Sequence, residues 1–359
     1  MLIRRLTMMA IDHRARFDKD IKANRVFVLG AGFSAAAGVP LTNELLQMAF
    51  TLFADECPGI YSRVEGYALE SIAQEGDLDV SRLNFSDLCT FLEFVELREY
   101  GGGERWSENG SREKLALRFF LAKALAACTP NGDNIPQLYI DFALQLQPRD
   151  IIISFNWDGL LEAALSAVGK KYTYDRSDDH AIAIYKLHGS LNWRLGEPKR
   201  LDGNPPKLPW AKLDFGSGMM DRHLYCTMDL LNRKTWQRFP PLSEVDPYLV
   251  LPGYGKAFDV RANAPLWYKP EFNFAFTHDV YIIGLSLAHD DFFIKSFFLS
   301  NLPYIQSYSG VEGRKVFVIN PSSAVYSDYE FVLSTGYAEV WNDPFSVEHV
   351  KAIVQRTAA

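Results

Sequence analysis

One short segment constrains the fold of this chain more than any other: an apolar run that leads straight into a glycine turn. The run VFVL at residues 26–29 is followed by GAGFSA at residues 30–35. A continuous apolar run is typical of a strand buried on both faces of a parallel sheet. Glycines at the turn let the backbone approach a pyrophosphate, and the amides of the next helix favour its charge. The segment therefore predicts a dinucleotide-binding turn, although a plain strand-to-helix turn fits the same residues.

Further apolar runs occur along the chain, with helical segments between several of them. They lie at residues 151–155, 182–187, 248–251, 280–283 and 316–319. This alternation of strand and helix predicts an α/β fold with a Rossmann-like parallel sheet.

Two insertions interrupt the alternation. Residues 55–150 lack strand patterns and predict helices, one beginning near Ser86 and two more at about 112–127 and 135–146. An ordinary dinucleotide-binding unit would instead return quickly to a second strand that bears an acidic residue. Residues 195–245 are rich in proline and polar groups, which predicts an irregular insertion.

The predicted core spans residues 25–325, and a shorter segment lies on either side of it. Residues 1–24 carry apolar side chains at helical spacing, which predicts an N-terminal amphipathic arm. Residues 326–359 form a C-terminal tail that we expect to pack on the core.

Composition and charge exclude several classes of protein. Of the 359 residues, 48% are hydrophobic and 14% aromatic, which is too apolar for a chain that is disordered throughout. A formal net charge of −7 argues against direct binding to nucleic acid, which needs a basic surface. The four cysteines are widely separated, and no pair has the spacing of a zinc or redox motif. Because neither a signal peptide nor a membrane-spanning run is evident, we expect a soluble, cytoplasmic protein with no membrane partner.

Polar residues follow the predicted strands where these end. Asn156 and Asp158 come directly after the run at 151–155, and ligands in open α/β sheets gather at the carboxyl ends of strands. Helix capping explains Asp158 equally well, and Asn156 less well, since one residue suffices as the cap. His188, which is followed by glycine, closes the run at 182–187. Such a histidine suits a general base, although a hydrogen-bonded surface histidine is more common for one taken alone.

In their order and in their amino-acid sequences, these segments resemble the motifs of the sirtuin superfamily. That family carries GAGxS…GIP, TQNID, HG, GTS and an asparagine after a later strand. This chain has GAGFSAAAGVP, SFNWD, KLHGS, GLSL and INP over roughly residues 25–325. The resemblance implies an NAD⁺-binding sheet of sirtuin type, with Asn156 and His188 as the catalytic pair and Asp158 beside the nicotinamide pocket.

The same resemblance assigns the other motif residues to the rest of NAD⁺. It implies that the first glycine turn contacts the phosphates and ribose, through Gly30, Ala31, Gly32 and Ser34. It implies that the later strand ends hold the adenosine half, through Gly284, Ser286 and Asn320. Taken one by one, these later segments are ordinary turn chemistry.

The chain also departs from the sirtuin deacylases. Those enzymes have four zinc cysteines between HG and GTS, whereas this interval holds only Cys226, so we expect neither a zinc ribbon nor a metal. Phe155 replaces the glutamine of TQNID, and LTN follows GVP where the family has Asp-Phe-Arg. The tract at 248–256, the aspartates after GLSL and the helix after residues 84–87 resemble the zinc-less bacterial sirtuin-like NADases of antiphage defence.

This branch implies that NAD⁺ is a substrate, hydrolysed to nicotinamide and ADP-ribose in abortive-infection defence. The alternatives are a sensor that binds NAD⁺ or ADP-ribose without turnover, and a protein deacylase, which the missing cysteines disfavour. A nicotinamide dehydrogenase is disfavoured by the missing early second strand. An NADase must be gated, and the segments outside the core are too short for a sensor domain. We therefore expect a homo-oligomer and, by family resemblance, a partner in trans such as a HerA-type ATPase or an Argonaute-type protein.

Overall fold

The computed structural model describes most of the chain. The described residues are 24–97, 111–175, 177–196, 223–226, 247–260, 263–268, 277–287, 291–307, 315–330 and 338–358. Residues 1–23, which hold the expected arm, and most of the insertion at 195–245 lie outside this part.

A sheet of seven strands forms the centre of the main body, in the order β10-β9-β8-β1-β2-β4-β3. Its strands are β1 (Asn24–Leu29), β2 (Ile151–Ser154), β3 (Tyr172–Thr173), β4 (Ile182–Lys186), β8 (Thr277–Ile283), β9 (Lys315–Ile319) and β10 (Ala338–Trp341). Every neighbouring pair is parallel, which confirms the predicted α/β fold with a Rossmann-like sheet. The strand before the glycine turn, β1, lies between β8 and β2 in the middle of the sheet.

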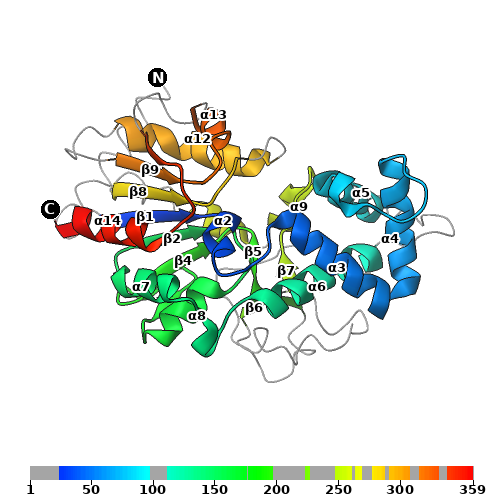
Figure 1. Ribbon diagram of the computed structural model, residues 1–359, viewed down its shortest axis with the longest axis horizontal. Coiled ribbons are helices and arrows are strands. Elements are labelled where there is room, and N and C mark those ends of the chain that lie inside the picture. The colour runs from blue at the N-terminus through cyan, green and yellow to red at the C-terminus, as the bar shows by residue number, and fades with distance from the viewer. Residues whose placement is uncertain are drawn as a thin grey trace.

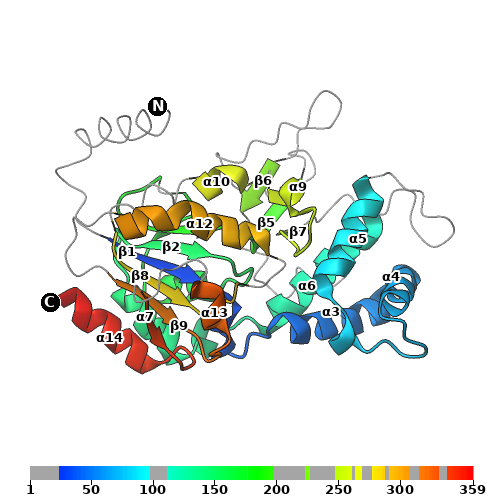
Figure 2. The same ribbon diagram turned by 90° about the horizontal axis from the view of Figure 1, so that it is seen from above.

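Helices cover both faces of the sheet, and this burial explains why its strands are apolar without alternation (Figure 1, Figure 2). One face carries α10 (Ala264–Tyr268) and α12 (Phe292–Ser307). The other carries α7 (Gln137–Gln145), α8 (Leu160–Ala167) and α14 (Val347–Ala358). All four residues of β2 are buried between these layers.

Two bidentate ion pairs stabilise the amino ends of central strands. Arg25 at the start of β1 donates through Nε to Asp150 Oδ1 at 3.0 Å, and its Nη2 donates to the second carboxylate oxygen. Arg356 of α14 donates through Nε and Nη2 to Asp279 of β8, both at 2.9 Å. Since a guanidinium and a carboxylate meet in one preferred geometry, these pairs set how β2 and α14 sit against the sheet.

The C-terminal residues continue the sheet as well as covering it. β10 adds a parallel edge strand beside β9, and α14 follows it and packs near α7. A short helix, α13 (Val325–Glu330), lies between β9 and β10 along the chain.

Four helices form a second body with its own apolar core, at the side of the sheet (Figure 1). It contains α3 (Thr42–Glu56), α4 (Pro58–Ser71), α5 (Phe85–Leu97) and α6 (Ser111–Cys128), with a short 3₁₀ turn at Val80–Arg82. A second 3₁₀ turn, at Gly132–Asn134, comes before α7. The predicted helices near residue 86, at 112–127 and at 135–146 correspond to α5, α6 and α7. Aromatic contacts tighten this core, such as Phe53 of α3 stacked on Phe120 of α6 with ring centroids 4.8 Å apart.

A small antiparallel sheet connects the two bodies. It has the order β6-β5-β7 and contains β5 (Gly189–Gly196), β6 (His223–Cys226) and β7 (Pro247–Leu249). The run at 248–251 was expected among the strands of the parallel sheet, and this was wrong. Its side chains alternate: Tyr248 and Val250 pack in the core of the main sheet, while Leu249 and Leu251 pack in the helical core. The run is continuously apolar because both of its faces are buried. A strand inside a parallel sheet and a strand that bridges two cores are both buried in this way, so their sequences look alike.

Candidate active site

The carboxyl ends of β1, β2 and β4 lie side by side at one edge of the main sheet (Figure 1). Their last residues, Leu29, Ser154 and Lys186, share one register row across the three strands. The segments after this row carry the glycine turn, Asn156 and His188. Residues far apart in the sequence therefore meet here because their strands end at the same level.

Asn156 is held by hydroxyl groups from two sides. Its Nδ2 lies 3.3 Å from Ser34 Oγ, in α2 (Ala31–Ala35), and its backbone amide donates to Ser154 Oγ at 3.2 Å. Asn156 is 8% exposed and Ser34 is fully buried. The bond to Ser154 fixes the backbone of Asn156, and the bond to Ser34 orients its buried side chain in advance of any ligand.

His188 is buried in an aromatic environment. Its ring lies 5.0 Å from that of Phe155 and 6.1 Å from that of Trp267 in α10, centroid to centroid. Its Nε2 has no hydrogen-bond partner among the described residues. Burial lowers the pKa of His188 to about 3, and the charge of Lys256 acts in the same direction. The imidazole is therefore neutral near pH 7, and its Nε2 can accept a proton.

A lysine–aspartate pair lies next to His188. Lys256 is the first residue of α9 (Lys256–Val260), and its Nζ is 2.6 Å from Asp291 Oδ2. The same oxygen is 4.0 Å from His188 Nε2. No motif predicted a role for either residue, because they are separated by 35 positions and belong to different segments. The only sequence signal was the presence of both in tracts that resemble the zinc-less branch.

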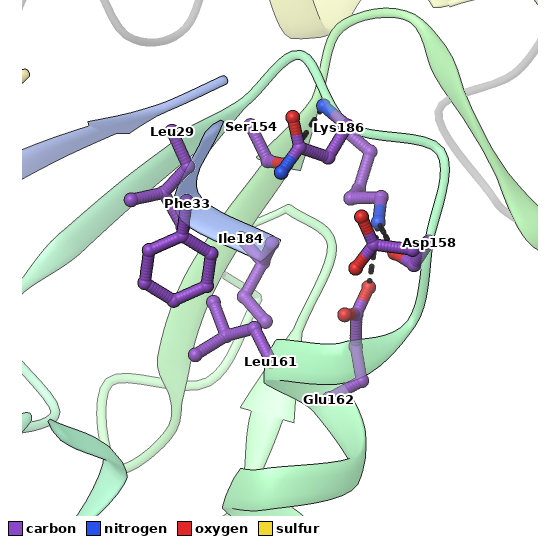
Figure 3. A pocket seen from close by; sticks show the side chains of 9 residues that line it. Leu29, Phe33, Ser154, Asp158, Leu161, Glu162, Ile184 and Lys186 are labelled. Atoms are coloured by element: carbon purple, nitrogen blue, oxygen red, sulfur yellow. Dashed lines mark hydrogen bonds and ion pairs between the residues drawn. The ribbon is translucent and has the colours of Figure 1, made fainter. Parts of the chain in front are cut away.

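Asp158 has a local structural function. Its Oδ1 accepts a hydrogen bond from the amide of Leu160 at 3.1 Å, at the start of α8. The N-cap of α8 is Gly159, so Asp158 forms a local turn one residue before the cap and does not cap the helix itself. Lys186 Nζ reaches between the Asp158 backbone carbonyl, to which it donates, and Glu162, whose Oε1 is 3.1 Å away (Figure 3).

A small, mainly apolar cavity lies beside the Lys186–Glu162 pair, with room for about one water molecule. Its lining combines apolar and polar side chains, namely Leu29, Phe33, Ser154, Asn156, Asp158, Leu161, Glu162, Ile184 and Lys186 (Figure 3). Asn156 and Asp158 thus border one cavity, while Lys186 and Glu162 neutralise each other within it.

The glycine turn lies against the loop that follows β8. The amide of Gly30 donates to the Ile283 carbonyl at 3.0 Å, and that of Gly32 donates to the Gly284 carbonyl at 2.8 Å. A Cβ at Gly30 would overlap the backbone of Leu285. The two glycines are required for this close approach of backbones, and their amides already have partners. Ala31, between them, is exposed at the same edge.

The remaining predicted residues lie at the ends of β8 and β9. Asn320 is 8% exposed, and its Nδ2 donates to the Leu285 carbonyl at 3.2 Å. Gly284 has a φ of +62°, and Ser286 is exposed. The structure thus brings all ten predicted site residues to one edge, in two neighbouring groups: one at β1, β2 and β4, the other at β8 and β9.

Within the described residues, no three histidine, cysteine or acidic side chains are grouped so that they could hold a metal ion. Cys226 Sγ accepts a hydrogen bond from Asn192 Nδ2 at 3.4 Å.

The described helices include none with the length and apolarity that crossing a membrane requires.

Comparison with known proteins finds likeness only among solved structures. No protein-family model matches the chain, and no curated protein sequence does. A sirtuin from work on sirtuin substrate affinity is 12% identical with a TM-score of 0.40, and 93% of each chain is covered. Sir2Tm bound to a propionylated peptide is 14% identical with a TM-score of 0.37, again over 93% of each chain. Sir2 bound to an acetylated peptide is 12% identical with a TM-score of 0.40 over 93% of each chain.

Proposed function

We propose that this protein binds NAD⁺ and hydrolyses the bond between nicotinamide and ribose, which yields nicotinamide and ADP-ribose. One observation carries the proposal: Asn156, fixed by Ser34, and His188, buried and neutral, follow adjacent strands at the ligand-binding edge of the sheet. An oriented amide and a neutral base at neighbouring strand ends are what hydrolysis of a glycosidic bond needs. These are also the residues that the sirtuin-like motifs indicate as the catalytic pair.

Breaking the nicotinamide–ribose bond builds positive charge on the ribose, as in other glycoside hydrolyses. Nicotinamide leaves as a neutral base with the bonding electron pair. The oxygen of a water molecule forms the new bond to the ribose carbon, and the proton that this water loses passes to His188 Nε2. Asn156 anchors the attacking water or a ribose hydroxyl through its amide. The rings of Phe155 and Trp267 keep bulk water away from His188.

The other motif residues would line the rest of the NAD⁺ site. Ala31 and Ser286 are exposed at the same edge, where a dinucleotide lies in open α/β sheets. We assign Gly30 and Gly32 the role of shaping the loop, because their amides donate to backbone carbonyls. Gly284 and Asn320 shape the neighbouring loop in the same way, beside the adenosine half. We assign Asp158 to the rim of the nicotinamide pocket, next to Asn156.

The biological part of the proposal is antiviral defence by depletion of NAD⁺ in the cytoplasm. Such an activity must be switched off in a healthy cell. We propose control by assembly, as a homo-oligomer with a protein partner supplied in trans, of which a HerA-type ATPase or an Argonaute-type protein are the candidates. The helical body built from α3 to α6 offers surface for such contacts.

A single assay separates this function from its alternatives. Purified protein is incubated with NAD⁺ alone, and nicotinamide, ADP-ribose and NADH are measured; an acetylated peptide is then added. We expect nicotinamide and ADP-ribose without peptide. The protein alone should release these products slowly, and the proposed partner should speed their release. Release that depends on the peptide would indicate a deacylase, NADH a dehydrogenase, and binding without any product a sensor. Each of these three results, obtained with the protein and its partner together, would refute the proposed hydrolysis.

A further inference from the structure

Three separate segments bring charged and titratable groups to one point beside Nε2 of His188. His188 follows β4, Lys256 begins α9, and Asp291 precedes α12. Asp291 Oδ2 lies 2.6 Å from Lys256 Nζ and 4.0 Å from His188 Nε2. The side chains are 10%, 3% and 15% exposed for His188, Lys256 and Asp291, so little solvent screens their charges.

Each partner of His188 is held in place by the fold. The second carboxylate oxygen of Asp291 accepts the amide of Ile294 at 3.1 Å, which caps α12. Helix α9 is anchored to α6 of the helical body, because Asp259 accepts from Arg118 Nη2 at 3.0 Å and from Lys114 Nζ at 3.4 Å. Lys256 and Asp291 therefore reach His188 from rigid elements on two sides.

We propose that Asp291, held by Lys256, is a positioning residue that acts on His188 through its charge: at 4.0 Å from Nε2 it makes no hydrogen bond, and it stabilises the imidazolium that forms when Nε2 takes a proton. This inference rests on the proposed NAD⁺ hydrolysis and names a component of that same site. Lys256 has the complementary role of keeping His188 unprotonated before the reaction. The proton comes from the attacking water and returns to solvent from His188 after ADP-ribose leaves.

The charges of Lys256 and Asp291 shift the pKa of His188 in opposite directions. Burial lowers the pKa of His188 most, Lys256 lowers it further, and Asp291 raises it; a hydrogen bond with the Phe155 backbone also raises it. Burial would raise the pKa of Asp291, but the interactions with His188 and Lys256, together with the hydrogen bonds from Lys256 and the Ile294 amide, lower it below its usual value. With the Lys256 charge beside it, Asp291 stays ionised near pH 7. A carboxylate that remains ionised can stabilise an imidazolium without itself becoming protonated.

The first test is a titration of His188 by NMR, without NAD⁺. Histidine is labelled with ¹³C, and the His188 signal among the seven histidines is assigned with His188→Gln. In the wild type we expect no change in this signal between about pH 4 and pH 8. Lys256→Met should raise the His188 midpoint by about one unit or more, because Asp291 then faces it alone. The double variant Lys256→Met/Asp291→Asn should lower the midpoint again, since asparagine keeps the helix cap and loses the charge.

A loosened structure would behave differently in this titration. If Lys256→Met merely admitted water around His188, the titration midpoint of His188 would rise in this variant. The midpoint would then stay high in the double variant as well, and the proposal would be overturned. No rise in Lys256→Met would overturn it as well. Lys123→Met is the matched control, because Lys123 pairs with Glu56 on the helical body and should leave the His188 signal unchanged.

The second test measures nicotinamide release. Asp291→Asn should lower kcat at least ~10-fold with little change in KM, since the interaction forms only as charge develops on His188. In the His188→Ala background the same substitution should have no further effect. An equal loss in both backgrounds would refute the role. If the wild-type protein releases no nicotinamide, the proposed function fails, while the titration still decides the charge relationship independently.

Discussion

The amide of Gly32 donates a hydrogen bond to the carbonyl of Gly284 across 2.8 Å, which joins the loop after β1 directly to the loop after β8. A Cβ on Gly32 would lie 2.8 Å from the Cα of Gly284, and one on Gly284 would overlap the backbone of Gly32 and Phe33. Gly284 also has a φ of +62°, which residues with a side chain rarely adopt. Two motifs that the sequence separates widely are thus parts of one packed structure.

Gly32→Ala and Gly284→Ala should therefore destabilise the protein strongly. Because the atoms that a methyl group would meet are backbone, they cannot rotate away, and we expect a loss of about 2 kcal/mol or more in the free energy of unfolding. Urea denaturation followed by circular dichroism measures this. Gly66→Ala is the control: Gly66 lies inside α4 with nothing within 4 Å of an added Cβ, and alanine there should stabilise by about 0.5–1 kcal/mol. Equal stability of Gly32→Ala and wild type would contradict the close contact.

Asn156→Ala and His188→Ala should each reduce the rate of NAD⁺ hydrolysis at least ~10²-fold, the usual range for a catalytic acid–base group. Nicotinamide release under saturating NAD⁺ measures the rate, and circular dichroism checks that the fold is kept. Ser34→Ala should lower the rate less, because Ser34 acts by holding the Asn156 amide at 3.3 Å. Near-wild-type hydrolysis by either alanine variant of the pair would exclude the assignment.

Glu93 should make the stability depend on pH. Burial in the helical body raises the pKa of Glu93 from 4.5 to about 7, so the folded protein keeps this proton where the unfolded chain has released it. Between these two values the unfolded state binds fewer protons, and the free energy of unfolding therefore falls as pH rises from about 4.5 to about 7. Glu93→Gln should remove this decline, an effect on the order of 1 kcal/mol or more at pH 8.

Urea midpoints at several pH values between 5 and 8, with about one unit between them, measure this effect. Glu75→Gln, at an exposed position, is the control and should follow the wild type. A wild-type protein that is equally stable across this range would contradict the raised pKa of Glu93.

The protein should not require zinc. A structural zinc site takes about four cysteine or histidine ligands at close spacing, and its removal normally unfolds the domain it holds. Elemental analysis should find no stoichiometric zinc, and a chelator should leave the melting temperature unchanged. One zinc ion per chain would show that ligands outside the described residues complete a site.

Control by assembly predicts an oligomer in solution. Size-exclusion chromatography with light scattering at micromolar protein should give a mass above that of the 40.7 kDa chain. Hydrolysis should be slow until the partner is added. A monodisperse monomer that hydrolyses NAD⁺ rapidly with nothing added would refute gating through assembly.

Local patterns were enough to predict most of the individual elements. The strands at 26–29, 151–155 and 280–283 are buried on both faces, and such burial leaves a continuous apolar run that can be read without a structure. The positions of Asn156 and His188 at strand ends follow from the same patterns.

Other features depended on which segments the fold brings together. The run at 248–251 looks like the others but bridges two cores, because burial on both faces does not say which sheet a strand joins. The Lys256–Asp291 pair beside His188 had no local signal either. By itself the sequence determined most strands of the parallel sheet, several helices and the residues at the strand ends, because strand burial and turn chemistry act between near neighbours. Only the tertiary structure decided the strand order, the bridging sheet and the charges that surround His188, because these are contacts between segments far apart along the chain.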